Sequence, residues 1–441
     1  MTTRPAFTFR PLLTAFALAM VSVLILIPTR PAQAQTFTVL HNFTGGADGG
    51  SPFGSLVMDR FSNIYGVATY GGNSCPGEPY NSGCGVVFKM EQHGSEWIFL
   101  PVYAFTGSDG ANPVGAVTVA PDGSLYGATD AGGLGSCNDW GTGCGTVYHL
   151  RPSPTWCHEV WCAWNNTVLY SFTGGVDGGS SWGGVALDSA GNIYGTTYRG
   201  GSGHGVAYAV THSQSGWTES VIHNFTAGSD GTWPASSLIS DSSGNFYGTT
   251  EFGGDNQFCG SGCGTVFKLS PSGSGWNESV LYAFQGGSDG AVPQASVVFD
   301  SAGNLYGTNL GGALNVAFEL SPSSGNWLLT PLYGFQFGGL EALRSPLTLD
   351  SAGNLYGVTE FGGISSGNCP YGCGTVFKLA PTASGWSYTT LHEFDFSDGF
   401  EPYGGVVVDS EGNIYGTASG GGPNSNRACE LGCGVVWKIT Q

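Results

Sequence analysis

Charged residues are scarce in this sequence, and basic residues are the scarcest. Only 10% of the 441 residues are charged, and Lys plus Arg number 12 against 31 Asp plus Glu. Binding to phosphate backbones or anionic lipid requires basic patches, so this balance argues against a nucleic-acid or lipid partner. No stretch after the N-terminal segment combines a helical apolar period with helix caps. A second long apolar run is also missing, so we expect no membrane span in the mature chain.

The N-terminal segment has the pattern of a secretory signal. Basic residues precede an apolar run from Leu12 to Ile27, and Ala32-Gln33-Ala34 supplies the small-x-small site that signal peptidase accepts. An uncleaved anchor is the alternative, although the apolar run is short for a membrane span. We therefore predict a signal peptide over residues 1–34. Residues 35–441 should form a secreted protein, either extracellular or periplasmic.

Cysteine is plentiful for a chain of this kind. Ten of the 12 cysteines form local pairs just before a strand-like segment, and the other two are also close together. An even number in an exported chain favours disulfides. Zinc is the alternative, but two cysteines per segment cannot complete a four-ligand site. We therefore predict no metal site and six local disulfides: Cys75–Cys84, Cys137–Cys144, Cys157–Cys162, Cys259–Cys263, Cys369–Cys373 and Cys429–Cys433.

One octapeptide recurs along the chain. Asp-Ser-Ala-Gly-Asn-Leu-Tyr-Gly occupies residues 300–307 and again residues 350–357, and five looser copies share its Tyr-Gly ending. The seven copies are about 58 residues apart on average, and a period of this size indicates a repeat architecture. The tyrosines of the seven copies are Tyr65, Tyr126, Tyr194, Tyr247, Tyr306, Tyr356 and Tyr415.

Each unit contains four short strand signals separated by turn residues. Examples, from strand one to strand four, are Ser296–Asp300, Asn304–Thr308, Thr265–Leu269 and Val280–Phe284. The Asp-Ser-x-Gly-Asn turn joins strands one and two, and its Asp can accept backbone N–H bonds. The turn lacks the later ligands of a calcium loop, so we interpret it as structural.

Four antiparallel strands per unit match a blade of a β-propeller. The seven units therefore predict one all-β, seven-bladed propeller over residues 35–441. The mature chain begins with a lone fourth strand, residues 36–43, and ends on a third strand, Val435–Ile439. Pairing these two strands would complete the last blade and close the ring. With strand one innermost, the loops from strand four to strand one share a face with the cysteine loops.

The repeated blocks resemble the GloVer tandem repeat of exported bacterial proteins. The blocks are Asn-x-Tyr-Gly-Thr-Thr, Gly-Gly, Gly-Thr-Val-Phe-Lys-Leu and Leu-Tyr-x-Phe, and they cover about residues 36–441. More distantly, the Asp-x-x-Gly-Asn-Leu-Tyr block is similar to a turn of NHL-type propellers, and the Gly-Gly with a later Trp is similar to kelch blades. The resemblance implies an exported propeller and brings no established activity with it.

One position just after the loop from strand four to strand one differs in every unit. It should open the innermost strand at the mouth of the central channel, where a purely structural position would be uniform. Aromatic residues there could stack on sugar rings or peptide side chains, with packing as the alternative. We predict that Phe53, Trp182 and Tyr403 form an aromatic edge of the channel mouth. The other occupants of this position are Val114, Ala235, Gln294 and Pro346.

The same loop carries Asp-Gly in six units. Asp-Gly is a strong turn former, so a structural role is the alternative to a binding role. As candidate ligand-binding groups, these carboxylates would make the channel-mouth face the most acidic one. They are Asp48, Asp109, Asp177, Asp230, Asp289 and Asp398.

No motif for catalysis stands out. Residues 179–183 match Gly-x-Ser-x-Gly, but the strand–turn–helix context of a hydrolase is missing. We predict no catalytic residue and no cofactor, and we favour a monomeric, non-catalytic module that binds a glycan, a peptide or an extracellular protein. One alternative is a metal-assisted lyase or lactonase at the central channel, as in virginiamycin-lyase-type and gluconolactonase-type propellers. Another is a structural cell-surface protein. A structural or channel divalent cation stays open.

Overall fold

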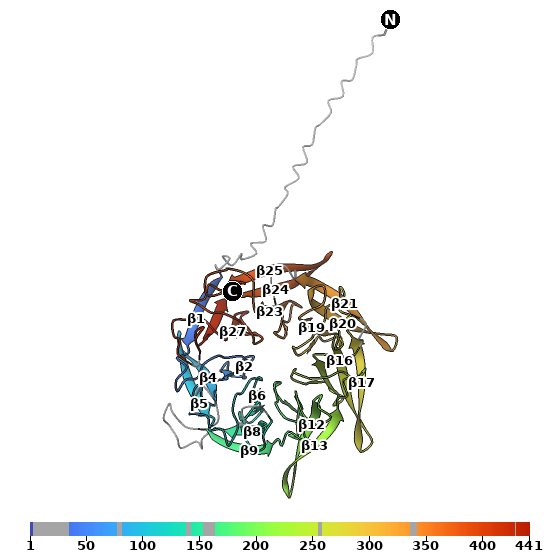
Figure 1. Ribbon diagram of the computed structural model, residues 1–441. Helices are drawn as coiled ribbons and strands as arrows, with labels where there is room; N and C mark the ends of the chain where they lie inside the picture. The colour runs from blue at the N-terminus through green and yellow to red at the C-terminus, as the bar shows by residue number, and fades with distance from the viewer. Residues whose placement is uncertain are drawn as a thin grey trace. The chain divides into compact units, whose positions relative to one another are not determined.

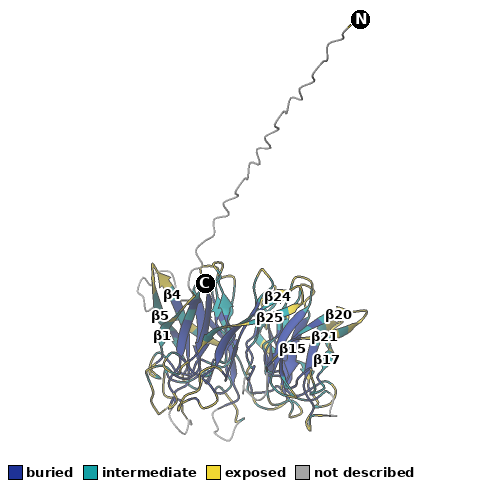
Figure 2. Cartoon of the chain, turned by 90° about the horizontal axis from the view of Figure 1, so that it is seen from above, coloured by how far each residue is buried: buried dark blue, intermediate teal, exposed yellow. Residues whose placement is uncertain are grey.

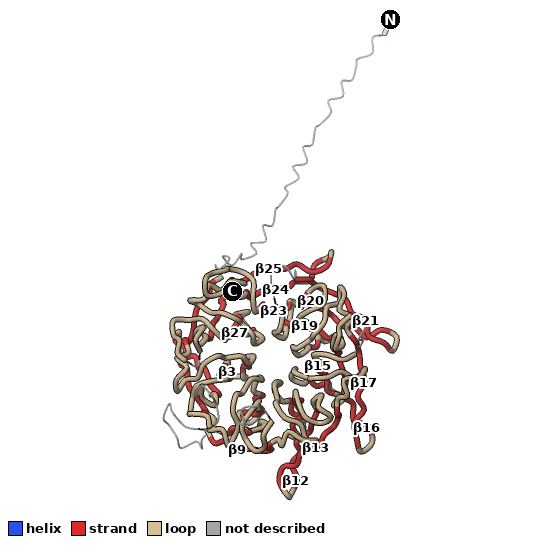
Figure 3. Tube along the Cα trace, in the orientation of Figure 1, coloured by secondary structure: helices blue, strands red, loops and turns tan. Residues whose placement is uncertain are grey.

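Seven four-stranded antiparallel sheets stand in a ring, as the computed structural model in Figure 1 shows. The ring, Thr36–Gln441, is one compact unit. Figure 3 shows only strands and loops in the described part of this unit. The prediction of an all-β, seven-bladed propeller is therefore confirmed, while the signal segment lies almost wholly outside the described residues. The structure describes residues 1–2, 35–76, 82–137, 143–152, 164–254, 258–335, 342–427 and 429–441.

Blades are numbered in chain order, from β2–β5 for blade 1 to β26–β28 with β1 for blade 7. The innermost strands are β2 (Val57–Met58), β6 (Thr118–Val119), β10 (Ala186–Leu187), β14 (Ile239–Ser240), β18 (Val298–Phe299), β22 (Thr348–Leu349) and β26 (Val407–Val408). The second strands are β3 (Ile64–Ala68), β7 (Leu125–Ala128), β11 (Ile193–Thr197), β15 (Phe246–Thr250), β19 (Leu305–Asn309), β23 (Leu355–Thr359) and β27 (Ile414–Ala418).

The third strands are β4 (Val86–His93), β8 (Thr146–Arg151), β12 (Val206–Ser213), β16 (Thr265–Ser272), β20 (Asn315–Ser323), β24 (Thr375–Thr382) and β28 (Val435–Thr440). The outer strands are β5 (Glu96–Ala104), β9 (Asn165–Ser171), β13 (Gly216–Asn224), β17 (Gly275–Ala283), β21 (Asn326–Phe335), β25 (Gly385–Glu393) and β1 (Thr36–Asn42). Figure 2 shows that the middle of each blade is buried while the hairpin tips are exposed.

The innermost strands are shorter than the sequence indicates. We expected Ser296–Asp300 to be a strand, but β18 pairs with its neighbour only through Val298 and Phe299. The residues just before each inner strand contact the next blade instead. A Cβ atom on Gly115, for example, would lie 2.4 Å from the backbone of Gly183. Backbone therefore meets backbone around the inner ring, and these residues have left the ladder to make that contact.

The first strand closes the ring as predicted. β1 pairs antiparallel with β28, from Thr36 opposite Thr440 to Asn42 opposite Val435. Phe43 follows directly and is only 1% exposed. β1 therefore supplies the outer strand that blade 7 would otherwise lack, which is the role of a closing strand in a propeller.

The Asp-Ser-x-Gly-Asn turns are held by their own carboxylates. Asp300 Oδ1 accepts from the backbone N–H groups of Ala302 (2.8 Å) and Asn304 (2.9 Å). Its Oδ2 accepts from the side-chain amide of Asn304 (2.8 Å). The turn therefore needs no ion to satisfy its carboxylate. Neighbouring blades then pack through aromatic pairs, as between Trp276 and Tyr194, whose ring centroids are 5.5 Å apart.

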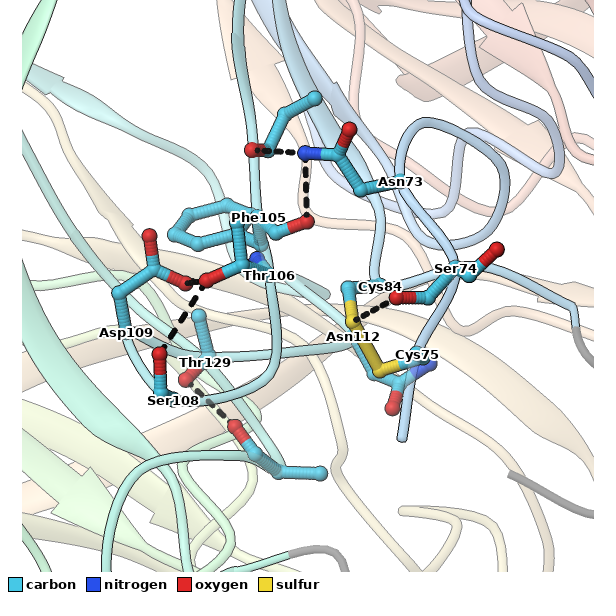
Figure 4. Close-up of a disulfide and its surroundings, with 12 residues drawn as sticks. Asn73, Ser74, Cys75, Cys84, Phe105, Thr106, Ser108, Asp109, Asn112 and Thr129 are labelled. Atoms are coloured by element: carbon cyan, nitrogen blue, oxygen red, sulfur yellow. Dashed lines mark hydrogen bonds between the residues drawn. A yellow bond between two sulfur atoms is a disulfide. The ribbon is translucent and has the colours of Figure 1, made fainter. Parts of the chain in front are cut away.

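Five of the predicted disulfides are present, and the sixth, Cys157–Cys162, lies outside the described residues. Figure 4 shows one of them, Cys75–Cys84, beside the loop that follows the outer strand of the same blade. Such a disulfide covers a turn tightly, because a Cβ atom on Gly174 would lie 2.0 Å from Sγ of Cys137. The five are Cys75–Cys84, Cys137–Cys144, Cys259–Cys263, Cys369–Cys373 and Cys429–Cys433.

Candidate functional site

The inner ends of the seven loops from strand four to strand one form a single pocket, which we call the mouth pocket. Its cavity volume is about 90 Å³, whereas pockets that enclose a drug-sized ligand hold roughly 300–1,000 Å³. The mouth pocket can therefore admit one ring or side chain, and a larger ligand would lie across it. All seven variable positions line it: Phe53, Val114, Trp182, Ala235, Gln294, Pro346 and Tyr403.

The loop that carries each lining residue bends two residues earlier. In six blades the backbone there has a positive φ, although none of the residues is glycine. This conformation is unfavourable for bulky or β-branched side chains, yet a Trp and a Val adopt it. Its recurrence shows that the ring imposes the loop path, so the lining positions share one geometry while their side chains differ. The six residues are Ser51, Asn112, Ser180, Trp233, Val292 and Glu401.

Aromatic side chains form two groups at the mouth. Phe53 and Tyr403 meet edge to face, with ring centroids 5.4 Å apart. Trp182 stacks on Tyr198 at 4.7 Å, and Tyr198 stacks on Trp233 at 5.4 Å. The expected edge of three residues is therefore a pair plus a separate stack. All three still line the mouth pocket and none is buried between blades, since Trp182 keeps 37% of its surface exposed and the other two are half-buried.

Carboxylates hold the stacked rings in place. The indole N–H of Trp182 donates to Oδ1 of Asp130 (2.9 Å), and the hydroxyl of Tyr198 donates to Oε2 of Glu251 (2.8 Å). Burial raises the pKa of Asp130, although hydrogen bonds from Ser180 and Trp182 oppose the rise. Burial and the bond to Glu251 also raise the pKa of Tyr198. The stack therefore has a fixed orientation before any ligand arrives.

Charged side chains from blades 6 and 7 meet on the other side of the mouth. Nη1 of Arg344 donates to the hydroxyl of Tyr403 (3.2 Å), and the guanidinium lies 5.6 Å from the centre of that ring. Nε of Arg344 is 3.0 Å from Oε2 of Glu360. Burial raises the pKa of Glu360 to about 7 against the charge of Arg344, and Glu401 adds to the rise. One cation therefore faces several acids.

Three polar atoms in this region have no hydrogen-bond partner in the described part of the chain. They are Oε1 of Gln294, Nε of Arg344 and Oε2 of Glu360. Nε of Arg344 and Oε2 of Glu360 nevertheless lie 3.0 Å apart and form an ion pair with each other. Oε1 of Gln294 therefore has no partner of either kind, and its amide is oriented because Nε2 donates to Oε1 of Glu251 (2.5 Å). A buried polar group without a partner is costly, so Oε1 of Gln294 is a place where a ligand or water would be stabilised.

The six Asp-Gly carboxylates lie outside the mouth pocket and bond to their own turns. Oδ2 of Asp177 accepts from the hydroxyl of Tyr170 (3.0 Å) and from the backbone N–H of Thr173 (2.8 Å). Figure 4 shows Asp109 turned toward Thr106 in the same way. None of the six lines the mouth pocket, so the structure does not bring them together with the aromatic side chains. The remaining members, each bonded to a His or Tyr of the preceding strand, are Asp48, Asp230, Asp289 and Asp398.

A family sequence profile shows which protein family this chain belongs to. The sequence profile described as the Gloeobacter/Verrucomicrobia repeat matches residues 134–367 and 261–441. The chain belongs to this repeat family. The resemblance drawn from the repeated blocks is thereby confirmed. No curated protein sequence matches the chain.

The Gloeobacter/Verrucomicrobia repeat protein is also similar to solved structures. A protein from Lactobacillus plantarum shares 14% identity at a TM-score of 0.45, over 80% of this chain and 95% of that one. A protein described as an oxidoreductase (glucose dehydrogenase) from Thermus thermophilus shares 14% identity at 0.44, over 74% and 96%. TolB from Acinetobacter baumannii shares 11% at 0.42, over 76% and 66%. Similarity this low carries no argument about function.

Two features are absent from the ranges that the structure describes. No three or more His, Cys, Asp or Glu side chains are grouped so that they could hold a metal ion. No helix there has the length and apolar character needed to cross a membrane.

The charged side chains at the mouth pocket were not predicted from the sequence. Arg344 and Glu401 occupy the position two residues before the lining residue, and Glu251 and Glu360 follow the Thr that ends their inner hairpin. Both positions vary from blade to blade, as the lining position does. These four residues could have been found by comparing every position of the repeat between units, and not only the position expected at the channel mouth.

Proposed function

We propose that this protein is an exported binding module that engages a glycan, a peptide or an extracellular protein through the mouth pocket. The observation that carries the proposal is the convergence of seven variable residues on one pocket of a scaffold that otherwise repeats. Trp182 offers a partly exposed ring there, Oε1 of Gln294 has no partner among the described residues, and the guanidinium of Arg344 lines the pocket. Exposed aromatics with a few oriented polar groups are typical of ligand sites.

The covalent chemistry supports an oxidising compartment. Five disulfides are typical of proteins that fold under oxidising conditions. Together with the predicted signal peptide, they support secretion or periplasmic residence. We propose that the mature protein acts there as a monomer and without a cofactor.

The test removes both aromatic walls of the mouth. A Trp182→Ala/Tyr403→Ala double variant should lose binding to a glycan array and to a peptide array while it remains folded, with a single cooperative melting transition. Phe61→Ala is the matched control, because Phe61 is 70% exposed and lies in a turn at the opposite ends of the strands. If the double variant binds as the wild type does, the proposal is wrong.

The second candidate is a metal-assisted lyase or lactonase at the channel. One observation favours it: a carboxyl with a pKa of about 7, such as that of Glu360, suits proton transfer near neutral pH. Turnover of a lactone or glycan that stops on addition of a chelator, and returns with a divalent cation, would support this candidate over the binding module.

A further inference from the structure

The mouth pocket has an apolar half and a polar half. Phe53, Val114 and Trp182, from blades 1 to 3, supply aromatic and aliphatic surface. Gln294 and Arg344, from blades 5 and 6, supply an amide and a guanidinium on the other side. A ligand that fills the pocket must therefore show an apolar face to one side and hydrogen-bonding groups to the other.

The polar half is held ready by its own contacts. Glu251 accepts from Gln294 (2.5 Å) and from Tyr198 (2.8 Å), so the amide oxygen of Gln294 is directed by bonds already made. Arg344 is fixed by the hydroxyl of Tyr403 (3.2 Å) and by its 3.0 Å approach to Glu360. Side chains positioned in this way lose little entropy when a ligand binds.

The polar half offers both an acceptor and a donor. Oε1 of Gln294 has no hydrogen-bond partner among the described residues and can accept, and the guanidinium of Arg344 lines the pocket and can donate. A hydroxyl group can satisfy either kind, because it donates one hydrogen bond and accepts two. Neighbouring hydroxyls on one ring would satisfy both groups.

We propose that the ligand of the mouth pocket is a saccharide, one pyranose ring of which lies with its C–H face on Trp182 and its hydroxyls on Gln294 and Arg344. This inference rests on the proposed binding function and narrows it to one ligand class. A cavity of about 90 Å³ admits a single ring. The rest of an oligosaccharide would lie over the exposed stack of Trp182, Tyr198 and Trp233.

Charged ligands fit the same pocket less well. A lysine or arginine side chain would be placed next to the guanidinium of Arg344, which it would repel. An anion would meet Glu251 and Glu360, both only 8% exposed, around that one cation. A neutral group that both donates and accepts avoids both costs.

The experiment begins with an array of neutral bacterial, fungal and plant oligosaccharides. We expect binding by the wild type, followed by calorimetric titration with the best oligosaccharide. Trp182→Ala should weaken binding by about tenfold or more, as expected for an aromatic anchor. Gln294→Ala should weaken it by about fivefold, the effect of one lost hydrogen bond. Phe61→Ala should bind as the wild type, and every variant should remain folded, with a single cooperative melting transition.

Salt distinguishes the ligand classes. Binding of a neutral saccharide should change by less than about twofold between roughly 50 and 500 mM NaCl, because screening acts on charge pairs. If the glycan array stays blank while a peptide array shows binding that depends on Trp182 and weakens with salt, the saccharide is wrong and the binding module stands. If neither array shows binding that depends on Trp182, both proposals fail.

Discussion

Two sets of polar side chains lie on one face of the propeller and are used in opposite ways. The Asp-Gly carboxylates sit in the turns after the outer strands, and each is bonded to its own turn and to a neighbouring Tyr or His. The seven residues that line the mouth pocket differ in every blade, and Oε1 of Gln294 has no partner among the described residues. The repeated Asp-Gly turns satisfy their carboxylates locally, whereas the variable mouth keeps an acceptor that a ligand can use.

The energetics of the two sets should differ accordingly. Removing a satisfied buried carboxylate leaves its former donors unpaired, which costs stability. Removing a side chain that lacks a full set of partners costs little, and its loss should appear in binding. Substitutions in the two sets should therefore differ in their cost to stability.

The largest effect should come from opening the ring that holds both sets. Deleting residues 36–43 removes β1 and Phe43, which is 1% exposed. Losing a buried phenylalanine side chain alone costs about 3–5 kcal/mol, and the deletion also exposes the edge of β28. We therefore expect a loss of at least about 5 kcal/mol in the free energy of unfolding, measured by denaturant titration.

A chain that lacks only residues 1–34 is the control for this deletion. It keeps β1 and should unfold like the mature protein. An unchanged denaturation midpoint after deletion of residues 36–43 would contradict the closing role of β1.

Asp289→Ala should have the next largest effect. Asp289 is 8% exposed and accepts from the hydroxyl of Tyr282 (3.0 Å) and the backbone N–H of Gln285 (2.8 Å). Both donors lose their acceptor, as does the backbone N–H of Gly287 (3.1 Å), so we expect a loss of about 2–3 kcal/mol in unfolding free energy. Gln294→Ala, the matched change at the mouth, removes a single hydrogen bond, to Glu251, and should cost about 1 kcal/mol. Equal losses in the two variants would remove the contrast between the sets.

A smaller, pH-dependent effect on stability is expected where a glutamate lies near one of the Asp-Gly carboxylates. Burial raises the pKa of Glu219 to about 7 and the charge of Asp177 adds to the rise; Glu278 has the same relation to Asp230. An unfolded Glu titrates at about 4.3. Between about pH 4.3 and 7 the folded state therefore holds protons that the unfolded state has released, so stability should fall as pH rises through this window.

The comparison that isolates this effect is a Glu219→Gln/Glu278→Gln double variant. Its stability relative to the wild type should increase from about pH 5 to pH 8 by on the order of 1 kcal/mol, because both glutamates keep solvent contact that screens their charge. Denaturant midpoints at several pH values provide the measurement. A constant difference across that range would show that the two glutamates titrate normally.

The sequence was most informative where it repeats. The octapeptide at residues 300–307, with its copies, was sufficient to predict seven blades, and the lone strand at residues 36–43 was sufficient to predict the closure. The local disulfides followed from cysteine spacing, because a short loop leaves few other partners. These features depend on contacts within one unit or between equivalent units, which a repeat makes visible.

The mouth was only partly predictable for the opposite reason. The lining position of Trp182 could be found because it varies in a known column. Its partner Tyr198 could not, because their stacking depends on how two loops of blade 3 approach each other. Arg344 and Glu360 meet across two loops of blade 6 in the same way. Asp177 has a fully bonded carboxylate, whereas Oε1 of Gln294 has no partner among the described residues, and this distinction also required the positions of their neighbours.

The smallest effect should be a local one at Glu360. Its carboxyl should titrate near pH 7, since burial raises its pKa to about that value, Arg344 opposes the rise and Glu401 adds to it. Arg344→Gln removes the opposing charge and should move the midpoint up by about 1 pH unit. Glu401→Gln should move it down by less, because no contact joins the two carboxyls directly. Carbon-13 NMR of the glutamate side chains would follow the titration, with Glu278→Gln as a distant control.

The unfolding free energy should hardly change in either mouth variant, because Glu360 contributes charge to the pocket and little to the ring. A midpoint that stays fixed without Arg344 would mean that the guanidinium and carboxylate do not sense each other, and the polar half of the mouth would then not be the coupled group that its geometry indicates.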